Sequence, residues 1–163
     1  MSPKAEKFSA LLKENNIKVF EVTEAQDELQ TTVFRSALEA GGQRLPVVVI
    51  IDRSLFVIIR TVIAANCLND EGARVRVGKR INDLNGAYKI FKYYVRDGSL
   101  ILDICLPASD NGFEPDIVRV ALDLAVRHLA ETFPSLMEAV WGKEPADGGQ
   151  KTEDRGQKTE NKG

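Results

Sequence analysis

Histidine and cysteine are scarce in this chain of 163 residues, which has one histidine and two cysteines. A zinc site needs three or four ligands, and Cys67, Cys105 and His128 show neither CxxC nor HExxH spacing, so we expect no metal site. We expect both cysteines to be reduced and buried. The phosphate loops GxxxxGK(S/T) and GxGxxG and the GxSxG elbow are also missing. We therefore predict no catalytic residue and no cofactor.

An excess of charge of one sign is also missing, because 22 basic residues face 24 acidic ones, for a net charge of -2. A dedicated nucleic-acid binder usually carries a clustered basic excess. In Lys89–Arg96, the aromatic residues Phe91, Tyr93 and Tyr94 interleave with basic ones, and the alternative interpretation is a platform on which bases stack. Aromatic residues are common in ordinary strands, however. We predict no nucleic-acid partner.

No apolar run without charges is long enough to cross a membrane. The most apolar region, Val47–Cys67, contains Asp52, Arg53 and Arg60, and each would cost roughly 3 kcal/mol at the centre of a bilayer. We interpret this region as strands. The first sixteen residues are charged and amphipathic, without the continuous apolar core of a secretory signal. We therefore expect no membrane partner and a cytoplasmic location.

The residues that are present indicate helices and antiparallel strands. The spacing of apolar residues and the turn residues predict a first helix, a short extended segment and a loop, a meander of three strands, a second helix, a hairpin and a long last helix kinked at Pro134. In sequence order, these elements are Ser2–Asn15, Ile17–Val22, Glu24–Glu28, Leu29–Leu38, Leu45–Asp52, Leu55–Ala64, a helix ending at Asn85, the strands Lys89–Arg96 and Leu100–Leu106, and a helix from Glu114 to Trp141. The sequence therefore predicts an α+β domain with an antiparallel sheet in the order α-β-β-β-α-β-β-α.

Most of this assignment depends on two turns and on the start of one helix. Asp97-Gly98 is a strong signal for a two-residue hairpin turn. We predict that Asn85-Gly86 ends the second helix, because glycine adopts the left-handed conformation just past a helix end. That helix starts at about either Glu71 or Lys79, since Arg74–Gly78 also alternates like a strand.

Two strands of the meander have apolar residues on both faces. Successive side chains of a strand point to opposite sides, so Val47–Ile51 and Phe56–Ile59 make both faces of the sheet apolar. Helices can cover one face, and the other needs a different cover. Either Val47, Val49 and Ile51 or Val48 and Ile50 face outward. We predict that Val48, Ile50, Phe56 and Ile58 form a partner or dimer surface. We also expect a homodimer.

Asn82, Asn85 and His128 are the polar candidates for a site. Asn82 and Asn85 are three residues apart and share one side of a helix. They could face a ligand, but we favour a structural role in which they hydrogen-bond the backbone where the helix gives way to a strand. His128 lies at the margin of the apolar stripe of the last helix, and we predict a structural role for it as well.

The last segment, residues 142–163, differs in composition from the domain of residues 1–141. Ala146 is its only aliphatic or aromatic residue, and GQKTE occurs at Gly149–Glu153 and again at Gly156–Glu160. Such a segment cannot bury enough apolar surface to offset the entropy lost on ordering. We predict a disordered polar tail that is dispensable for stability.

The order of elements resembles the fold of type III secretion chaperones and, more closely, the YbjN family of bacterial proteins. The resemblance covers Ser2 to Trp141, and it is carried by INDLN (Ile81–Asn85), KIFKYYVRDGSLILDICLP (Lys89–Pro107) and FPSLM (Phe133–Met137). It implies a small α+β domain, often dimeric, without known catalytic residues. The secretion chaperones bind unfolded client segments along apolar surface, and YbjN proteins are described as sensory or regulatory proteins.

From the doubly apolar strands and this resemblance we expect a non-enzymatic protein-binding module, a chaperone-like or regulatory adaptor of the YbjN type. The alternative is a small-ligand-binding protein or an enzyme whose pocket lies between the sheet and the long helix. Convergent polar groups around Asn82, Asn85 or His128 would favour that alternative.

Overall fold

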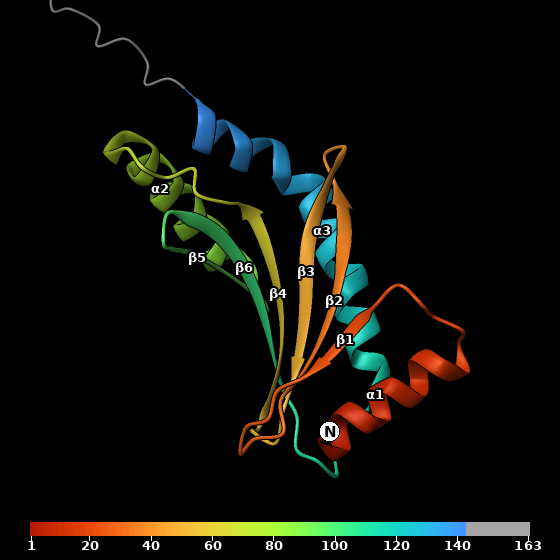
Figure 1. Cartoon of the computed structure of the whole chain (residues 1–163). Coiled ribbons are helices and arrows are strands. Elements are labelled where there is room, and N and C mark those ends of the chain that lie inside the picture. The colour runs from red at the N-terminus through yellow and green to blue at the C-terminus, as the bar shows by residue number, and fades with distance from the viewer. Residues whose placement is uncertain (143–163) are drawn as a thin grey trace, which may run out of the picture.

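One antiparallel sheet and three helices build the fold in the computed structural model, which describes residues 1–142 (Figure 1). The tail predicted for residues 142–163 lies outside this part, except for Gly142. In chain order the elements are α1 (Pro3–Glu14), β1 (Glu21–Glu24), β2 (Thr32–Ala40), β3 (Gln43–Ile51), β4 (Phe56–Ala64), α2 (Glu71–Ala87), β5 (Phe91–Arg96), β6 (Ser99–Pro107) and α3 (Asp116–Trp141).

The α+β class and the antiparallel sheet are as predicted, but the sheet has one more strand than expected. Its order is β1-β2-β3-β4-β6-β5. The additional strand is β1, which pairs with β2 from Glu21↔Arg35 to Glu24↔Thr32. The sequence placed an extended segment a few residues earlier and a loop at Glu24. All four residues of β1 are exposed, so the strand carries no pattern of alternating burial that sequence could reveal.

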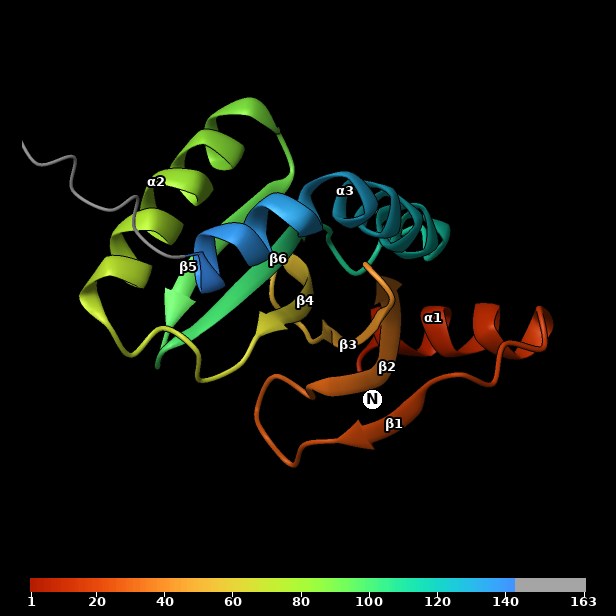
Figure 2. The same ribbon diagram turned by 90° about the horizontal axis from the view of Figure 1, so that it is seen from above.

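The three helices lie on one side of the curved sheet (Figures 1 and 2). Each strand therefore has an inner face, which packs against the helices, and an outer face. Phe8 of α1 meets Phe34 of β2 edge-to-face, with ring centroids 4.9 Å apart. On β6, Leu100, Leu102 and Ile104 are buried on the inner face, as their alternation predicted.

The second helix starts at Glu71, the earlier of the two predicted starts, and ends later than predicted. Asp70 caps its start, because its side chain accepts a hydrogen bond from the backbone N–H of Ala73 at 2.7 Å. Arg74–Gly78 is helical throughout. The prediction that Asn85-Gly86 ends the helix is wrong, since α2 continues to Ala87 and Gly86 does not adopt a positive φ.

The last helix continues through Pro134 as a single α-helix. Its axis changes direction in that region, as Figure 1 shows where the colour passes from teal to blue. Proline removes one backbone donor from a helix and crowds the preceding turn, which explains the bend. Beyond the bend, α3 runs beside α2, where Nε of Arg76 donates to the carbonyl oxygen of Ala139 at 3.2 Å. Just before the bend, the ring of Phe133 packs against the backbone of Gly41 in the β2–β3 turn.

Candidate functional site

The helices leave the outer face of the sheet uncovered within residues 1–142. Val47, Val49 and Ile51 are buried on the inner face, so Val48 and Ile50 point outward. Outward-facing apolar residues of three neighbouring strands lie side by side, because Val33 pairs with Ile50 and Ile50 pairs with Ile58. We call this group the apolar cluster; it consists of Val33, Val48, Ile50, Phe56 and Ile58.

The apolar cluster includes all four residues predicted from sequence to form a partner or dimer surface. Val48, Ile50 and Ile58 are half-buried by their neighbours in the sheet, and Phe56 is 48% exposed at the start of β4. The cluster lies toward the β3–β4 turn, at the lower end of the sheet in Figure 1. An uncovered apolar surface of this kind marks contact sites for other proteins in soluble domains.

A charged group interrupts the outer face beside the apolar cluster. Arg60 of β4 binds Asp103 of β6 through two hydrogen bonds, Nε to Oδ1 at 2.9 Å and Nη2 to Oδ2 at 2.8 Å. The hydroxyl of Tyr94 donates to the same carboxylate at 3.1 Å. Burial and the neighbouring Asp103 carboxylate raise the pKa of Tyr94, so this phenol remains a donor at neutral pH. Asp103 is only 4% exposed, and this buried ion pair was not foreseen from the sequence.

Basic side chains outnumber acidic ones on the outer face of the strands, although the whole chain has a net charge of -2. Strand alternation and pairing place five basic and three acidic side chains there, namely Arg35, Arg44, Arg60, Lys92 and Arg96 against Glu21, Glu39 and Asp103. Arg35 lies opposite Glu21, Arg44 lies opposite Glu39 and Arg60 binds Asp103, so the surplus basic side chains, Lys92 and Arg96, are both on β5.

The two cysteines differ from the prediction that both are buried. Cys67 is half-buried, and burial raises the pKa of its thiol. Cys105 is exposed on the outer face, where it pairs with Ile58 of the apolar cluster. The prediction was wrong for Cys105 because it lies near the end of β6, on the side of the sheet that no helix covers within residues 1–142. A thiol at this point can report on whatever covers the cluster.

Asn85 connects the end of α2 to the free edge of β5. Its side-chain amide donates to the carbonyl oxygen of Tyr93 at 3.0 Å and accepts from the N–H of Tyr93 at 2.7 Å. The amide thus pairs with both backbone groups that a further strand would use. Asn82 is exposed and shares no ligand-facing pocket with Asn85 in the described part of the chain. These contacts give Asn85 a structural role.

His128 is buried among aromatic rings at 4% exposure. Its ring stacks on Phe91 with centroids 3.9 Å apart and meets Tyr88 edge-to-face at 4.3 Å. Within residues 1–142, neither ring nitrogen has a hydrogen-bond partner. Burial lowers the pKa of His128, nearby Arg80 lowers it further, and Glu131 opposes both effects. Within residues 1–142, His128 thus has no hydrogen-bonded group from which it could take a proton as a general base.

The aromatic residues of β5 do not form a stacking platform. Phe91 and Tyr93 are buried on the inner face, whereas Tyr94 faces outward and is bound to Asp103. Tyr93 is also too deeply buried to ionise easily, and burial raises its pKa to about 12. A stacking platform needs several aromatic rings on one exposed face, and β5 has only one aromatic ring, that of Tyr94, on its outer face.

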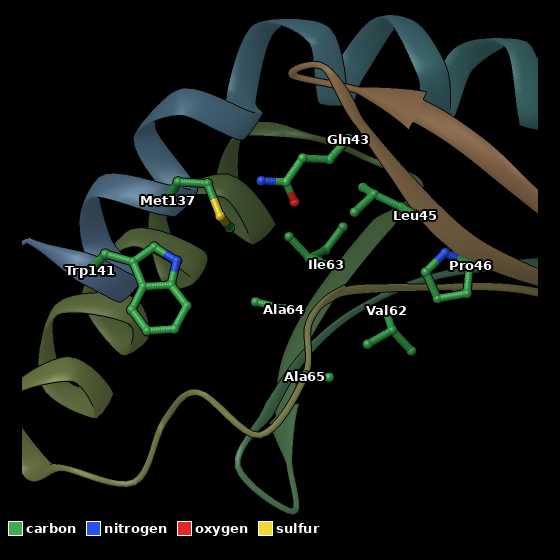
Figure 3. Close-up of a pocket in the computed structure, with 9 residues that line it drawn as sticks. All are labelled: Gln43, Leu45, Pro46, Val62, Ile63, Ala64, Ala65, Met137 and Trp141. Carbon is green, nitrogen blue, oxygen red and sulfur yellow. The ribbon is translucent and has the colours of Figure 1, made fainter.

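A cavity of about 310 Å³ lies at the opposite end of the sheet from the apolar cluster (Figure 3). It lies where β3 and β4 separate, below the end of α3. Its polar side-chain groups are the amide of Gln43, which points inward, toward Met137, and the indole N–H of Trp141. The other lining residues are Leu45, Pro46, Val62, Ile63, Ala64, Ala65 and Met137.

The cavity exists because the ladder between β3 and β4 stops early. The last pair is Val47↔Thr61, although β3 continues to Gln43 and β4 to Ala64. A two-residue turn joins β2 to β3. In such a hairpin, the backbone nitrogen and carbonyl oxygen of every second residue of β3 point away from β2, and Pro46 is one of these residues. Proline has no N–H to donate to β4. The sequence indicated that Pro46 lies outside the main ladder but did not reveal the cavity beside it.

None of the helices within residues 1–142 combines the length and the apolar composition that a membrane crossing requires. In the same residues, no three histidine, cysteine or acidic side chains come close enough to hold a metal ion. No family model matches the chain, no curated protein matches it, and no solved structure matches it.

Proposed function

We propose that the chain is a cytoplasmic, non-enzymatic protein-binding module, a chaperone-like or regulatory adaptor of the YbjN type, that works through the outer face of its sheet. The observation that carries this proposal is the apolar cluster, which no helix covers within residues 1–142. The helices already pack against the inner face, so the apolar cluster on the outer face is available to a second protein. We expect a second copy of the chain to be one such protein, forming a homodimer.

The alternative, a small-ligand site between the sheet and the long helix, has weaker support. The cavity does lie beside α3, but its polar side-chain groups are the amide of Gln43 and the indole N–H of Trp141 alone. Small-molecule sites usually present several convergent polar groups. Asn82, Asn85 and His128, from which such a site was expected, are not among the lining residues.

Two lysine substitutions on adjacent residues of β3 test the proposal. Ile50→Lys adds a charge to the outer face and should leave the domain folded. Val49→Lys should unfold it, because Val49 is fully buried and an unpaired charge there has no compensation. By analytical ultracentrifugation, we expect the wild-type chain to sediment as a dimer and the Ile50→Lys variant as a monomer.

The thiol of Cys105 gives an independent readout. A maleimide should label Cys105 more slowly in the wild-type dimer than in the Ile50→Lys variant. Val75→Lys is the matched control, because it changes an exposed apolar residue of α2, far from the outer face. A wild-type monomer at high concentration, with Cys105 labelled equally fast in all three proteins, would show that the face does not bind a second copy. Capture of the same lysate proteins by wild type and Ile50→Lys would reject the proposed surface.

A further inference from the structure

The buried ring of His128 joins α3 to the segment that connects α2 to β5. We call residues 88–90 the connection; Lys89 and Ile90 within it are exposed and belong to no helix or strand. The imidazole meets Tyr88, the first residue of the connection, edge-to-face and stacks on Phe91, the first residue of β5. These two ring contacts therefore fasten both ends of the connection to α3.

The surroundings of His128 suit a neutral ring and not a charged one. Neither ring nitrogen has a hydrogen-bond partner within residues 1–142, and the hydroxyl of Thr132 is already engaged with the carbonyl oxygen of His128 at 2.8 Å. Protonation would create a positive charge and two N–H donors in this place. Aromatic faces attract a cation, but the ring of Phe91 is within 13° of parallel to the imidazole, so the N–H bonds do not point at it. A buried charge without acceptors is unfavourable.

The charged groups that act on the imidazole come from two of the elements around it. Glu131 of α3 favours the protonated ring, and Arg80 of α2 opposes it. The phenols of Tyr88 in the connection and Tyr93 in β5 carry no charge at neutral or acidic pH. Arg80 and burial thus outweigh the one carboxylate, and they oppose protonation as long as the connection stays in place.

Hydrogen bonds on both sides of the connection limit how far an opening can spread. The side chain of Asn85 holds both backbone groups of Tyr93, at 2.7 and 3.0 Å, and β5 pairs with β6 along its whole length. At the other end, the N–H of Tyr88 donates to the carbonyl oxygen of Leu84 at 3.1 Å, which is the last bond of α2. The connection can therefore move while the strand beyond it stays paired.

We propose that His128 is a pH-sensitive switch: when its ring takes up a proton, the connection detaches from α3 and the ring reaches water, while β5 stays in the sheet from Tyr93 onward. The opening would uncover Phe91, now 9% exposed, beside Leu124, which is 41% exposed and lies one turn before His128 on α3. Acid would thus enlarge the apolar surface on the inner side of the domain. This device does not depend on the proposed protein-binding function.

The direction of the response follows from where the proton binds more tightly. Burial lowers the pKa of His128 below its ordinary value of 6.5 while the connection is closed, whereas a ring that water can reach titrates near the ordinary value. As the pH falls through 6.5, the open form takes up the proton first. The ratio of open to closed molecules then rises, approaching tenfold per pH unit, until the pH reaches the pKa of the closed form.

Hydrogen exchange of the full chain between pH 7.5 and 5, followed by NMR, tests the switch. Each exchange rate is compared with the intrinsic rate at the same pH, which gives a protection factor. The amide of Tyr88 reports on the connection and that of Tyr93 on the strand beyond it. We expect protection of Tyr88 to fall at least fivefold from pH 6.5 to 5 and protection of Tyr93 to change less than twofold.

Two variants connect this response to the imidazole. In His128→Phe, protection of Tyr88 should not depend on pH. Glu131→Gln changes an exposed residue and removes the charge that favours the protonated ring. It should lower the pH at which the imidazole titrates and deepen the loss of Tyr88 protection at pH 5. His128 is the only histidine of the chain, so its NMR signal is identified without further assignment.

Four results would overturn the inference. Protection of Tyr88 that is independent of pH in the wild-type chain, or that falls equally in His128→Phe, would show that the ring does not control the connection. Equal losses at Tyr88 and Tyr93 would mean that a larger unit unfolds. An imidazole signal that titrates at or above pH 6.5 would show that the buried site accepts the charge. The proposed function is judged separately, by the sedimentation of Ile50→Lys.

Discussion

Nζ of Lys4 donates a hydrogen bond to the carbonyl oxygen of Ala108 at 3.0 Å, although 104 residues separate the two in the chain. The same ammonium group donates to the carbonyl oxygens of Ser54 and, at 3.5 Å, Phe56. Lys4 is fully buried. One side chain of α1 thus ties the first helix to the β3–β4 turn and to the segment after β6.

We expect Lys4→Met to lower the free energy of unfolding by about 1–3 kcal/mol, because the buried carbonyl oxygens lose their donor while the shape of the side chain is kept. Urea denaturation at pH 7 measures the change. Lys7→Met is the control, since Lys7 also donates to two backbone carbonyl oxygens, 3.2 Å to Asp110 and 3.3 Å to Phe113, but is exposed. Equal losses in the two variants would contradict a special role for Lys4.

Asn85→Ala should destabilise the domain by about 1–2 kcal/mol, because it leaves both backbone groups of Tyr93 without a protein partner. Asn82→Ala, on the same helix but exposed, should change stability by less than about 0.5 kcal/mol. Thermal unfolding of the two variants, followed by circular dichroism, compares them directly. A larger effect at Asn82 than at Asn85 would be inconsistent with the observed hydrogen bonds.

The pKa of His128 in the folded chain lies below its ordinary value of 6.5, chiefly because of burial. As the pH falls through 6.5, the unfolded chain therefore takes up the proton first, and the folded state loses stability until the pH reaches the folded pKa. The slope in this window approaches about 1.4 kcal/mol per pH unit. His128→Phe removes the titrating ring and both unpartnered nitrogens, while keeping a flat ring beside Phe91.

We expect this variant to be at least as stable as wild type at pH 7.5 and to lose less stability between pH 7.5 and 5. Guanidinium denaturation at a series of pH values tests both expectations. Arg80, Glu131, Tyr88 and Tyr93 stay in place around the ring and serve as the internal reference. An unchanged pH profile would assign the acid sensitivity to other groups.

Gly41→Ala and Gly42→Ala separate two costs at the β2–β3 turn. Both residues have positive φ, 57° and 73°, so alanine costs about 1–2 kcal/mol at either position. At Gly41 the added Cβ would also lie 2.3 Å from the buried ring of Phe133, whereas nothing lies within 4 Å at Gly42. Gly41→Ala should therefore give the lower melting temperature in calorimetry. Equal melting temperatures would mean that the ring of Phe133 can move aside at little energetic cost.

The sequence predicted the hairpin turn in which two residues adopt positive φ. It did not predict the local structure of Asn85-Gly86, which depends on a tertiary contact. Asp97-Gly98 forms the expected hairpin turn, with φ of 50° and 70°. Asn85-Gly86 is the same kind of pair, yet it remains helical because Asn85 is held by Tyr93. Local propensity is the same in the two pairs, and only the strand that packs beside the second one decides the outcome.

The apolar cluster was predictable because strand alternation depends on sequence alone. The sequence did not tell which of the two alternating sets of β3 side chains packs against the helices. In the structure, Val48 and Ile50 lie on the outer face. The cavity and the pair Arg60–Asp103 could not be predicted, since they depend on where two ladders end and on which residues meet across β4 and β6. Those positions follow from the packing of α3 and from Pro46.

The early end of the β3–β4 ladder also determines how the domain should open under mild stress. Five residue pairs join β3 to β4, compared with nine between β2 and β3 and eight between β4 and β6. This short seam divides the sheet into two halves, one built on β1–β3 and the other on β4–β6. Partial unfolding tends to follow such boundaries between cooperative units. In native-state hydrogen exchange, the amides of Val48 and Ile50, which point to β4, should therefore exchange before those of Val47 and Val49, which point to β2.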